Sequence, residues 1–256
     1  MSLNTKAENT WCPGCGNFGI LTAAKNAIKE LIEEGISKEN FVLSSGIGCH
    51  AKIVDYININ SFYSLHGRAI PPLTGMKVAN KELKLIAFSG DGDSYDEGIA
   101  HLIHAAKRNS DINVIIHDNS VFALTTGQAT ATSLKGFRGK STPSGNVEEP
   151  INPIKLMLVS GATFVARGYA GNPNHLKELI KKAVKHKGFS YIEILQPCVI
   201  FNNTYQKFNK AVYDMNKEGH KISDLKAAMK KSEEFNGKIP IGVFYQTKKK
   251  TFEEQI

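Results

Sequence analysis

The sequence of 256 residues lacks several features that mark large classes of protein. It contains no apolar run that approaches the roughly 20 residues needed to span a bilayer. Its first residues lack the apolar core of a signal peptide. Hydrophobic residues make up 41% of the chain, which is too many for a disordered protein. We therefore expect a cytoplasmic protein with no membrane association, built as one large domain or as one domain plus an extension.

Acidic residues are outnumbered by basic ones, 24 against 32, which gives a formal net charge of +8. The simplest interpretation is a solvated surface rich in lysine. A nucleic-acid partner is not expected, because the sequence has no helix-turn-helix, zinc-finger or RNP motif. An acidic protein partner, attracted by the basic surface, is the remaining explanation.

Short apolar segments alternate with amphipathic segments along most of the chain. Apolar residues at three-to-four spacing predict helices at about 17–34, 99–106 and 176–184. Compact apolar runs predict strands at 41–43, 85–88, 114–116, 163–166 and 191–195. This alternation is typical of an α/β fold, in which a mostly parallel sheet carries helices on both faces.

Two segments depart from the alternation. Residues 135–150 are rich in Gly, Ser, Pro and charge, which predicts a long loop of the kind that often serves as a lid. Beyond residue 204 the chain is rich in lysine and weakly periodic. We predict a first domain over residues 1–204 and a C-terminal extension over residues 205–256, packed on that domain or on a partner.

A Gly-Asp-Gly segment follows one predicted strand, and an asparagine follows the next. Asp91 lies between Gly90 and Gly92, and Asn119 comes one crossover helix and one strand later. Both side chains should therefore lie at the carboxyl edge of the sheet, where open α/β proteins bind ligands. The glycines allow the backbone to approach a phosphate, and a carboxylate with an amide oxygen suits octahedral Mg²⁺. A lone Gly-Asp-Gly would predict only a turn.

The cysteines are few, but their positions are informative. Cys12 and Cys15 form a Cys-x-x-Cys pair ahead of the first predicted helix, while Cys49 and Cys198 each follow a predicted strand. A thioredoxin-like pair would follow a strand, and a zinc ribbon usually has a second Cys-x-x-Cys pair. Four thiolates on one side of the sheet fit a 4Fe–4S cluster, with a structural zinc site as the alternative.

Together these motifs resemble the β subunit of archaeal-type 2-oxoacid:ferredoxin oxidoreductases. The resemblance runs over roughly the first 200 residues and keeps the order of the segments 11–16, 46–49, 65–69, 90–93, 117–119, 124–128 and 195–198. It implies a thiamine diphosphate-binding fold. It also implies a CoA-dependent oxidative decarboxylation of 2-oxoacids, such as pyruvate and 2-oxoglutarate, to acyl-CoA and CO₂ with reduction of ferredoxin.

The resemblance implies roles for individual residues. Asp91, Asn119 and the carbonyl of Val121 would hold Mg²⁺, and all four cysteines would ligate one 4Fe–4S cluster close to the thiamine. The other implied residues are His66, Gly92 and Asp93 beside the diphosphate, Leu124 and Thr125 toward the thiazolium, and Ile47, Gly48, Cys49 and His50 along the cofactor cleft.

Two further positions bear on the substrate. Lys52 matches a family position near the substrate carboxylate, although a surface lysine is the alternative interpretation. Thr126 stands where relatives carry Lys, so we expect the far end of the substrate pocket to be less cationic than in those relatives. The preferred 2-oxoacid is left open.

The chain is expected to supply the diphosphate-binding part of a thiamine diphosphate site and not the pyrimidine-binding part. Activation of thiamine needs a Glu from a separate pyrimidine-binding domain, for which 256 residues leave no room. The resemblance therefore implies an α subunit in a heterodimer or a dimer of heterodimers, with ferredoxin, coenzyme A and a 2-oxoacid as further partners. A thiamine enzyme without a cluster, and a zinc-stabilised module that binds nucleic acid, are the competing hypotheses.

Overall fold

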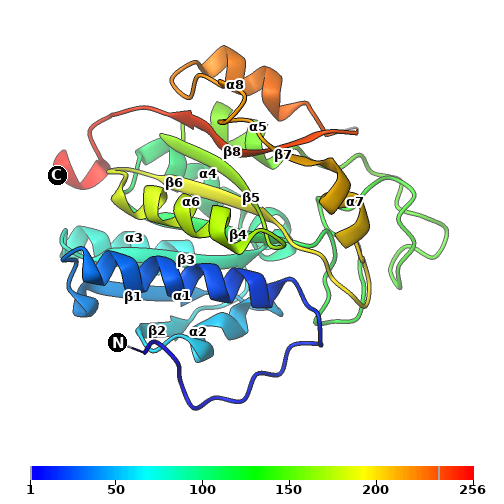
Figure 1. The fold of residues 1–256 in the computed structure, drawn as a ribbon, viewed down its shortest axis with the longest axis horizontal. Coiled ribbons are helices and arrows are strands. Elements are labelled where there is room, and N and C mark those ends of the chain that lie inside the picture. The colour runs from blue at the N-terminus through cyan, green and yellow to red at the C-terminus, as the bar shows by residue number, and fades with distance from the viewer. Residues whose placement is uncertain (1, 236) are drawn as a thin grey trace.

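The computed structural model describes residues 2–235 and 237–256 and arranges eight strands of this part of the chain in one sheet (Figure 1). The strand order is β2-β1-β3-β4-β6-β5-β8-β7. The strands are β1(Phe41–Ser45), β2(Asn60–Tyr63), β3(Lys84–Gly90), β4(Asn113–Asp118), β5(Phe164–Tyr169), β6(Ser190–Leu195), β7(Val212–Asp214) and β8(Ile239–Gln246). Only the pairing of β8 with β5 is antiparallel among these strands. The predicted α/β fold with a mostly parallel sheet is confirmed.

Helices cover both faces of the sheet, each over its own apolar core. One face carries α1 and α6, and the other carries α3, α4, α5 and α8 (Figure 1). The helices are α1(Asn17–Glu33), α2(Ile53–Tyr56), α3(Ile70–Ala79), α4(Ile99–Arg108), α5(Pro153–Val159), α6(Pro173–Lys185), α7(Tyr205–Ala211) and α8(Leu225–Ser232). The three helices predicted from apolar spacing correspond to α1, α4 and α6 and are confirmed.

The helices α1 and α6 lie side by side and are joined by charge as well as by apolar contact. Lys177 and Lys181 of α6 donate to the Glu30 carboxylate of α1 at 2.7 and 2.6 Å. Ile28 and Leu176 are fully buried in the core that these helices cover. These contacts hold α1 against the sheet and α6. The Cys-x-x-Cys pair lies just ahead of α1, so one end of its segment is held in place.

The segment after residue 204 completes the sheet. Its strand β8 pairs with β5, and β7 pairs with β8. Of the two expected positions of this extension, on the first domain or on a partner, the structure shows contact with the first domain. The boundary at residue 204 stays a prediction. None of the described helices has both the length and the apolar composition that crossing a membrane would require.

Loops gather at the carboxyl edge of the parallel strands, on the right of Figure 1. The longest runs from residue 119 to residue 152, between β4 and α5, and contains no helix or strand among the described residues. The predicted loop at 135–150 lies within it. The loops after β1, β3, β4 and β6 all open at this edge, so the motifs predicted from the sequence meet there.

Candidate functional site

A cleft of about 80 Å³ lies at the carboxyl edge, between the ends of β1, β3 and β4 and the loop after β4. Every residue that the sequence predicted at the diphosphate and magnesium site lines it. These are Ile47, Gly48, Cys49, His50, His66, Asp91, Gly92, Asp93, Asn119, Val121, Leu124 and Thr125. The structure adds Gly90, His117, Phe122, Ala123 and Gln196 to the lining.

Asp91 is the most unusual charge in the cleft. It is 2% exposed, and its Oδ2 accepts from the hydroxyls of Thr130 at 2.6 Å and Thr132 at 3.0 Å. Burial outweighs these hydrogen bonds and raises the pKa of Asp91 to about 6. No Lys, Arg or His of the described residues forms an ion pair with it. A buried carboxylate of this kind favours a bound cation.

The turn after β4 presents two further oxygens near the cleft. Asn119 Oδ1 accepts from the Val121 N–H at 3.0 Å, which folds the chain back toward the cleft. Asn202 donates to the Asn119 carbonyl at 2.9 Å, and Ser133 donates to the Ser120 carbonyl at 2.7 Å. A carboxylate, an amide oxygen and a carbonyl are hard ligands that suit Mg²⁺. In the described ranges, no three His, Cys, Asp or Glu side chains form a group that could hold a single metal ion. The candidate Mg²⁺ ligands are instead one carboxylate, one side-chain amide and one backbone carbonyl.

The two glycines of the motif make room for two rings. A Cβ at Gly90 would lie 2.7 Å from His50 Nδ1, and one at Gly92 would lie 2.2 Å from the Phe122 ring. The sequence explained these glycines by the approach of the backbone to a phosphate. Packing of the rings is a second and independent reason for them.

Asp93 connects two loops of the cleft. Its Oδ1 accepts from the backbone N–H groups of Gly67 at 2.7 Å and Ile47 at 3.2 Å. Its other neighbours are the Ser89 hydroxyl, His66 Nδ1 at 3.2 Å and His50 Nε2 at 3.5 Å. Burial opposes ionisation, but the hydrogen bond and charge of His50 prevail and lower the pKa of Asp93 to about 2. The carboxylate of Asp93 thus holds the loops that contain Ile47 and Gly67 in place around the cleft.

The four cysteines lie on loops that meet beside the cleft. Cys49 lines the cleft, and Trp11 Nε1 donates to the Cys49 carbonyl at 2.6 Å. Gln196 lines the cleft as well, and its Nε2 donates to Cys15 Sγ at 3.7 Å. Burial raises the pKa of Cys49 to about 11, and repulsion from the charges of the other three cysteines contributes. Cys49 is therefore within electrostatic reach of the other three cysteines and would need a metal to hold it as a thiolate.

Lys52 does not line the cleft. It lies on the turn η2(His50–Lys52) that follows Cys49, and its ammonium donates to Thr10 Oγ1 at 2.9 Å. Thr126 does not line the cleft either. The ammonium of Lys140 donates to Thr126 Oγ1 at 2.6 Å, so a cation lies beside this position. The expectation that the far end of the substrate pocket is less cationic than in relatives with Lys at this position stays a prediction.

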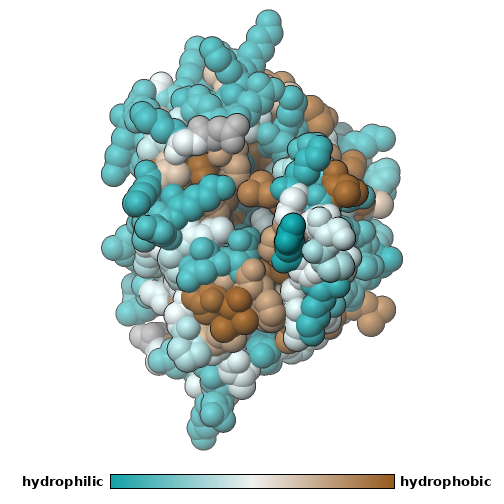
Figure 2. Space-filling view, turned by 90° about the vertical axis from the view of Figure 1, so that its right-hand side faces the viewer, coloured by the Kyte–Doolittle hydropathy of each residue, from teal (hydrophilic) through white to brown (hydrophobic). Residues whose placement is uncertain are grey.

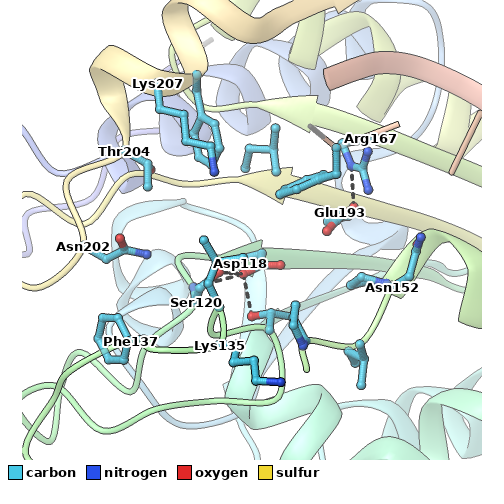
Figure 3. Close-up of a pocket in the computed structure, with 18 of the residues that line it drawn as sticks. Asp118, Ser120, Lys135, Phe137, Asn152, Arg167, Glu193, Asn202, Thr204 and Lys207 are labelled. Carbon is cyan, nitrogen blue, oxygen red and sulfur yellow. Dashed lines mark hydrogen bonds and ion pairs between the residues drawn. The ribbon is translucent and has the colours of Figure 1, made fainter. Parts of the chain in front are cut away.

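A larger cavity of about 440 Å³ lies between the long loop and the C-terminal segment (Figure 3). At one end Arg167 and Glu193 point toward one another at 2.7 Å, while Asn202, Thr204 and Lys207 extend from the segment opposite the loop. Thr132 donates to Asp118 at 2.9 Å as well as to Asp91, so this cavity and the cleft share a wall. The predicted cofactor residues line the smaller cleft and not this cavity.

Several residues of the site were not predicted from the sequence, and only some of them could have been. His117 and Gln196 belong to segments that carried the resemblance, so they could have been proposed. His117 is fully buried, and burial lowers its pKa well below the usual value, which keeps the ring neutral. Thr130 and Thr132 carried no signal, because hydroxyl residues in a loop are common and only the folded loop places them on Asp91.

Two family models match the chain and together cover most of it. Residues 46–194 match the C-terminal TPP-binding domain of thiamine pyrophosphate enzymes. Residues 198–256 match the C-terminal region of the pyruvate ferredoxin oxidoreductase beta subunit. The two matches meet at the end of β6, near the predicted boundary between domain and extension.

Relatives match over nearly the whole chain. A 2-oxoacid:ferredoxin oxidoreductase subunit beta from Saccharolobus solfataricus is 44% identical, over 97% of this chain and 85% of its own length. The 2-oxoglutarate synthase subunit KorB of Methanocaldococcus jannaschii is 35% identical, over 98% of this chain and 92% of its own. A solved 2-oxoglutarate:ferredoxin oxidoreductase from Magnetococcus marinus, with 2-oxoglutarate, coenzyme A and succinyl-CoA bound, is 38% identical with a TM-score of 0.94, over 99% of this chain and 86% of that one.

Proposed function

Since the chain belongs to the β subunits of 2-oxoacid:ferredoxin oxidoreductases, we propose that its cleft holds the diphosphate of thiamine diphosphate and that its four cysteines hold a 4Fe–4S cluster beside it. The enzyme acts together with an α subunit. It oxidatively decarboxylates 2-oxoacids in a CoA-dependent reaction. Thiamine diphosphate, when bound, supplies the nucleophilic carbon and the ring that accepts electrons on decarboxylation.

Asp91, Asn119 and the Val121 carbonyl are the proposed Mg²⁺ ligands. Their support is the buried carboxylate of Asp91, which has no ion-pair partner among the described residues, and the braced turn that presents the other two oxygens. A magnesium ion between Asp91 and the diphosphate would remove the cost of burying that carboxylate. His66 and the Gly92 backbone line the cleft where the diphosphate is proposed to lie.

The position of Cys49 is the one observation that supports the proposal most directly. Cys49 lines the cleft and is also one of the four cysteines that lie close together. Gln196 forms a second link between the cleft and Cys15. Cys12, Cys15, Cys49 and Cys198 would hold a 4Fe–4S cluster, which would supply one-electron transfer beside the cleft. Ferredoxin is the proposed electron acceptor.

The α subunit is proposed to cover the open side of the cleft. Pockets that enclose a ligand of cofactor size have volumes of about 300–1,000 Å³, and this cleft has about 80 Å³. The lining residues Ile47 and Leu124 are exposed by 40% and 48%, and Leu65, next to the lining residue His66, is exposed by 77%. The face that carries α7 and the long loop shows apolar patches between hydrophilic side chains (Figure 2). Such patches are typical of protein interfaces.

Lys52 remains a candidate for binding the substrate carboxylate. Its ammonium is held by the neutral hydroxyl of Thr10 and forms no ion pair among the residues that the structure describes. It follows Cys49 by three positions, so it lies close to the proposed cluster and cleft.

The assignment of the cysteines is tested by iron analysis of the anaerobic complex with the α subunit. We expect about four irons per β chain and a broad brown absorbance. Single Cys→Ala changes at positions 12, 15, 49 and 198 should each abolish or severely degrade the signal. Trp11→Phe removes the indole N–H next to Cys49 without removing a thiol, and should keep it.

A stable full complement of iron in one Cys→Ala variant would remove that cysteine from the ligand set. One zinc per chain in place of iron would contradict the cluster itself and support the zinc-stabilised alternative.

A further inference from the structure

The side chain of Gln196 connects the cofactor cleft with the Cys-x-x-Cys segment. Its Nε2 donates to Cys15 Sγ at 3.7 Å, and the same side chain lines the cleft. The Gly16 N–H donates to the Pro197 carbonyl at 3.2 Å, which joins the backbone beside Cys15 to the segment that carries Gln196. A Cβ at Gly16 would lie 2.8 Å from Gln196 Cγ, so the glycine leaves room for this side chain. The fold therefore brings the amide to this sulfur.

Cys15 differs from the other three cysteines in the donors around its sulfur. Among the described residues, it is the only cysteine whose sulfur accepts a side-chain hydrogen bond. Burial raises the pKa of Cys15, whereas the backbone N–H of Asn17 and the side-chain amide of Gln196 favour its thiolate. Asn17 is the first residue of α1, so the sulfur also lies near the positive end of that helix. Negative charge is therefore stabilised at this sulfur by specific groups of the chain.

The amide of Gln196 has no other hydrogen-bond partner in the described part of the chain. The residue is 2% exposed, and its Oε1 is buried without a partner among the described residues. Burying an amide with one weak partner lowers folding stability, so a structural role does not explain the contact. A thiol can donate as well as accept, but a thiolate bound to iron only accepts. The bound cluster would therefore hold the amide with its N–H toward the sulfur.

We propose that Gln196 is a positioning residue that raises the reduction potential of the cluster through its hydrogen bond to Cys15. This inference rests on the proposed function, in which the cluster takes one electron at a time from the decarboxylated substrate and passes it to ferredoxin. Reduction adds negative charge to the cluster and its sulfurs, so an N–H that donates to a sulfur stabilises the reduced state more than the oxidised state. A higher potential makes the cluster a better acceptor for electrons released in the cleft that Gln196 also lines.

The test is an anaerobic redox titration of the complex with the α subunit, followed by electron paramagnetic resonance of the reduced cluster. Gln196→Met keeps the length of the side chain but removes the donor, so reduction of the cluster should become about tenfold less favourable. For a one-electron couple this corresponds to a midpoint potential about 59 mV lower. Gln196→Glu places an ionised carboxylate where the amide was and should lower the potential further. A merely structural role would not order the three potentials in this way.

Tyr205→Phe is the matched control. The Tyr205 hydroxyl donates to the Gly14 carbonyl at 3.1 Å, in the same Cys-x-x-Cys segment but not to a sulfur, so its loss should leave the potential unchanged. Hyperfine spectroscopy of the wild-type cluster, with isotope-labelled glutamine side chains, should detect the amide nitrogen and needs no variant to assemble a cluster.

Two results would overturn the inference and leave the proposed function standing. One is an unchanged potential in both Gln196 variants with the cluster intact, and the other is the absence of a glutamine nitrogen coupled to the wild-type cluster. A wild-type complex without any 4Fe–4S signal would contradict the proposed function itself.

Discussion

The buried carboxylate of Asp91 should lower the folding stability of the metal-free protein and favour the binding of Mg²⁺. Its pKa is raised to about 6 by burial, from an ordinary 3.8. A group whose folded-state pKa is raised loses stabilisation as the pH climbs from the unfolded value through the folded one. Without a cation, the protein should therefore lose about 2–3 kcal/mol of folding stability from this residue as the pH rises from about 4 to about 6.

Asp91→Asn should have opposite effects on stability and on cofactor binding. At pH 8 the metal-free protein should melt higher than the wild type, because a buried charge is removed while the Thr130 and Thr132 hydroxyls keep an acceptor. Affinity for thiamine diphosphate with Mg²⁺ should fall at least about tenfold. Thermal melts and calorimetry of the complex measure the two quantities.

Asn119→Ala is the matched comparison, since it removes a neutral ligand from the same cleft. It should weaken cofactor binding less than Asp91→Asn and should not raise the melting temperature. Equal cofactor affinity in Asp91→Asn and wild type would show that Asp91 holds no metal.

Individual residues were predictable where chemistry restricts the choice of side chain. Asp91, Asn119 and the four cysteines were singled out because few residue types can serve as metal ligands, and their spacing placed them at one edge of the sheet, where the structure has them. Their role as ligands stays a proposal. The environment of a side chain was not predictable. Lys140 beside Thr126, and Lys52 on Thr10, depend on how two loops fold against each other. Distant loops leave no periodic pattern that would reveal such contacts.

At the scale of elements, a buried ion pair joins neighbouring strands of the sheet. Arg167 of β5 donates to Glu193 of β6 at 2.7 Å, and both are at most 2% exposed. The guanidinium lies 5.3 Å from the ring centres of both Phe235 and Phe244. The Arg167 guanidinium between these strands is therefore paired with a carboxylate and packed against two aromatic rings.

Arg167→Met should leave the Glu193 carboxylate buried without its partner. Removing one member of such a pair costs about 3–5 kcal/mol, so the apparent melting temperature should drop by roughly 6–20 °C. Adding Glu193→Leu should recover much of the loss, because the second charge is then removed too. Lys155→Ala breaks the exposed pair with Glu233 and should cost less than about 1 kcal/mol. Equal effects of Arg167→Met and Lys155→Ala would contradict this account.

Elements were predictable where apolar residues form a pattern. The strands β1, β3, β4, β5 and β6 are compact apolar runs, and all five were found. β2 was missed because three of its four residues are exposed at the edge of the sheet. β8 was missed because Pro240 and Gly242 interrupt its apolar run, and both residues are normally unfavourable in strands.

The whole molecule has a cleft too small to enclose its cofactor. The isolated chain should therefore bind thiamine diphosphate at least about tenfold more weakly than the complex with the α subunit. Inorganic pyrophosphate with Mg²⁺ should bind the two equally, because the proposed diphosphate site lies within this chain alone. Anaerobic calorimetry with both ligands measures the difference. Equal affinity of chain and complex for thiamine diphosphate would show that the α subunit does not contribute to its site.

The antiparallel pairing of β8 with β5 has a consequence for how the protein is made. β5 is synthesised some 70 residues before β8, so its outer edge has no neighbour on the ribosome until residues 239–246 emerge. An open edge is a template for pairing with other nascent chains. The strand that covers this edge of β5 thus emerges long after β5 itself, and premature termination before it would leave a chain prone to aggregate.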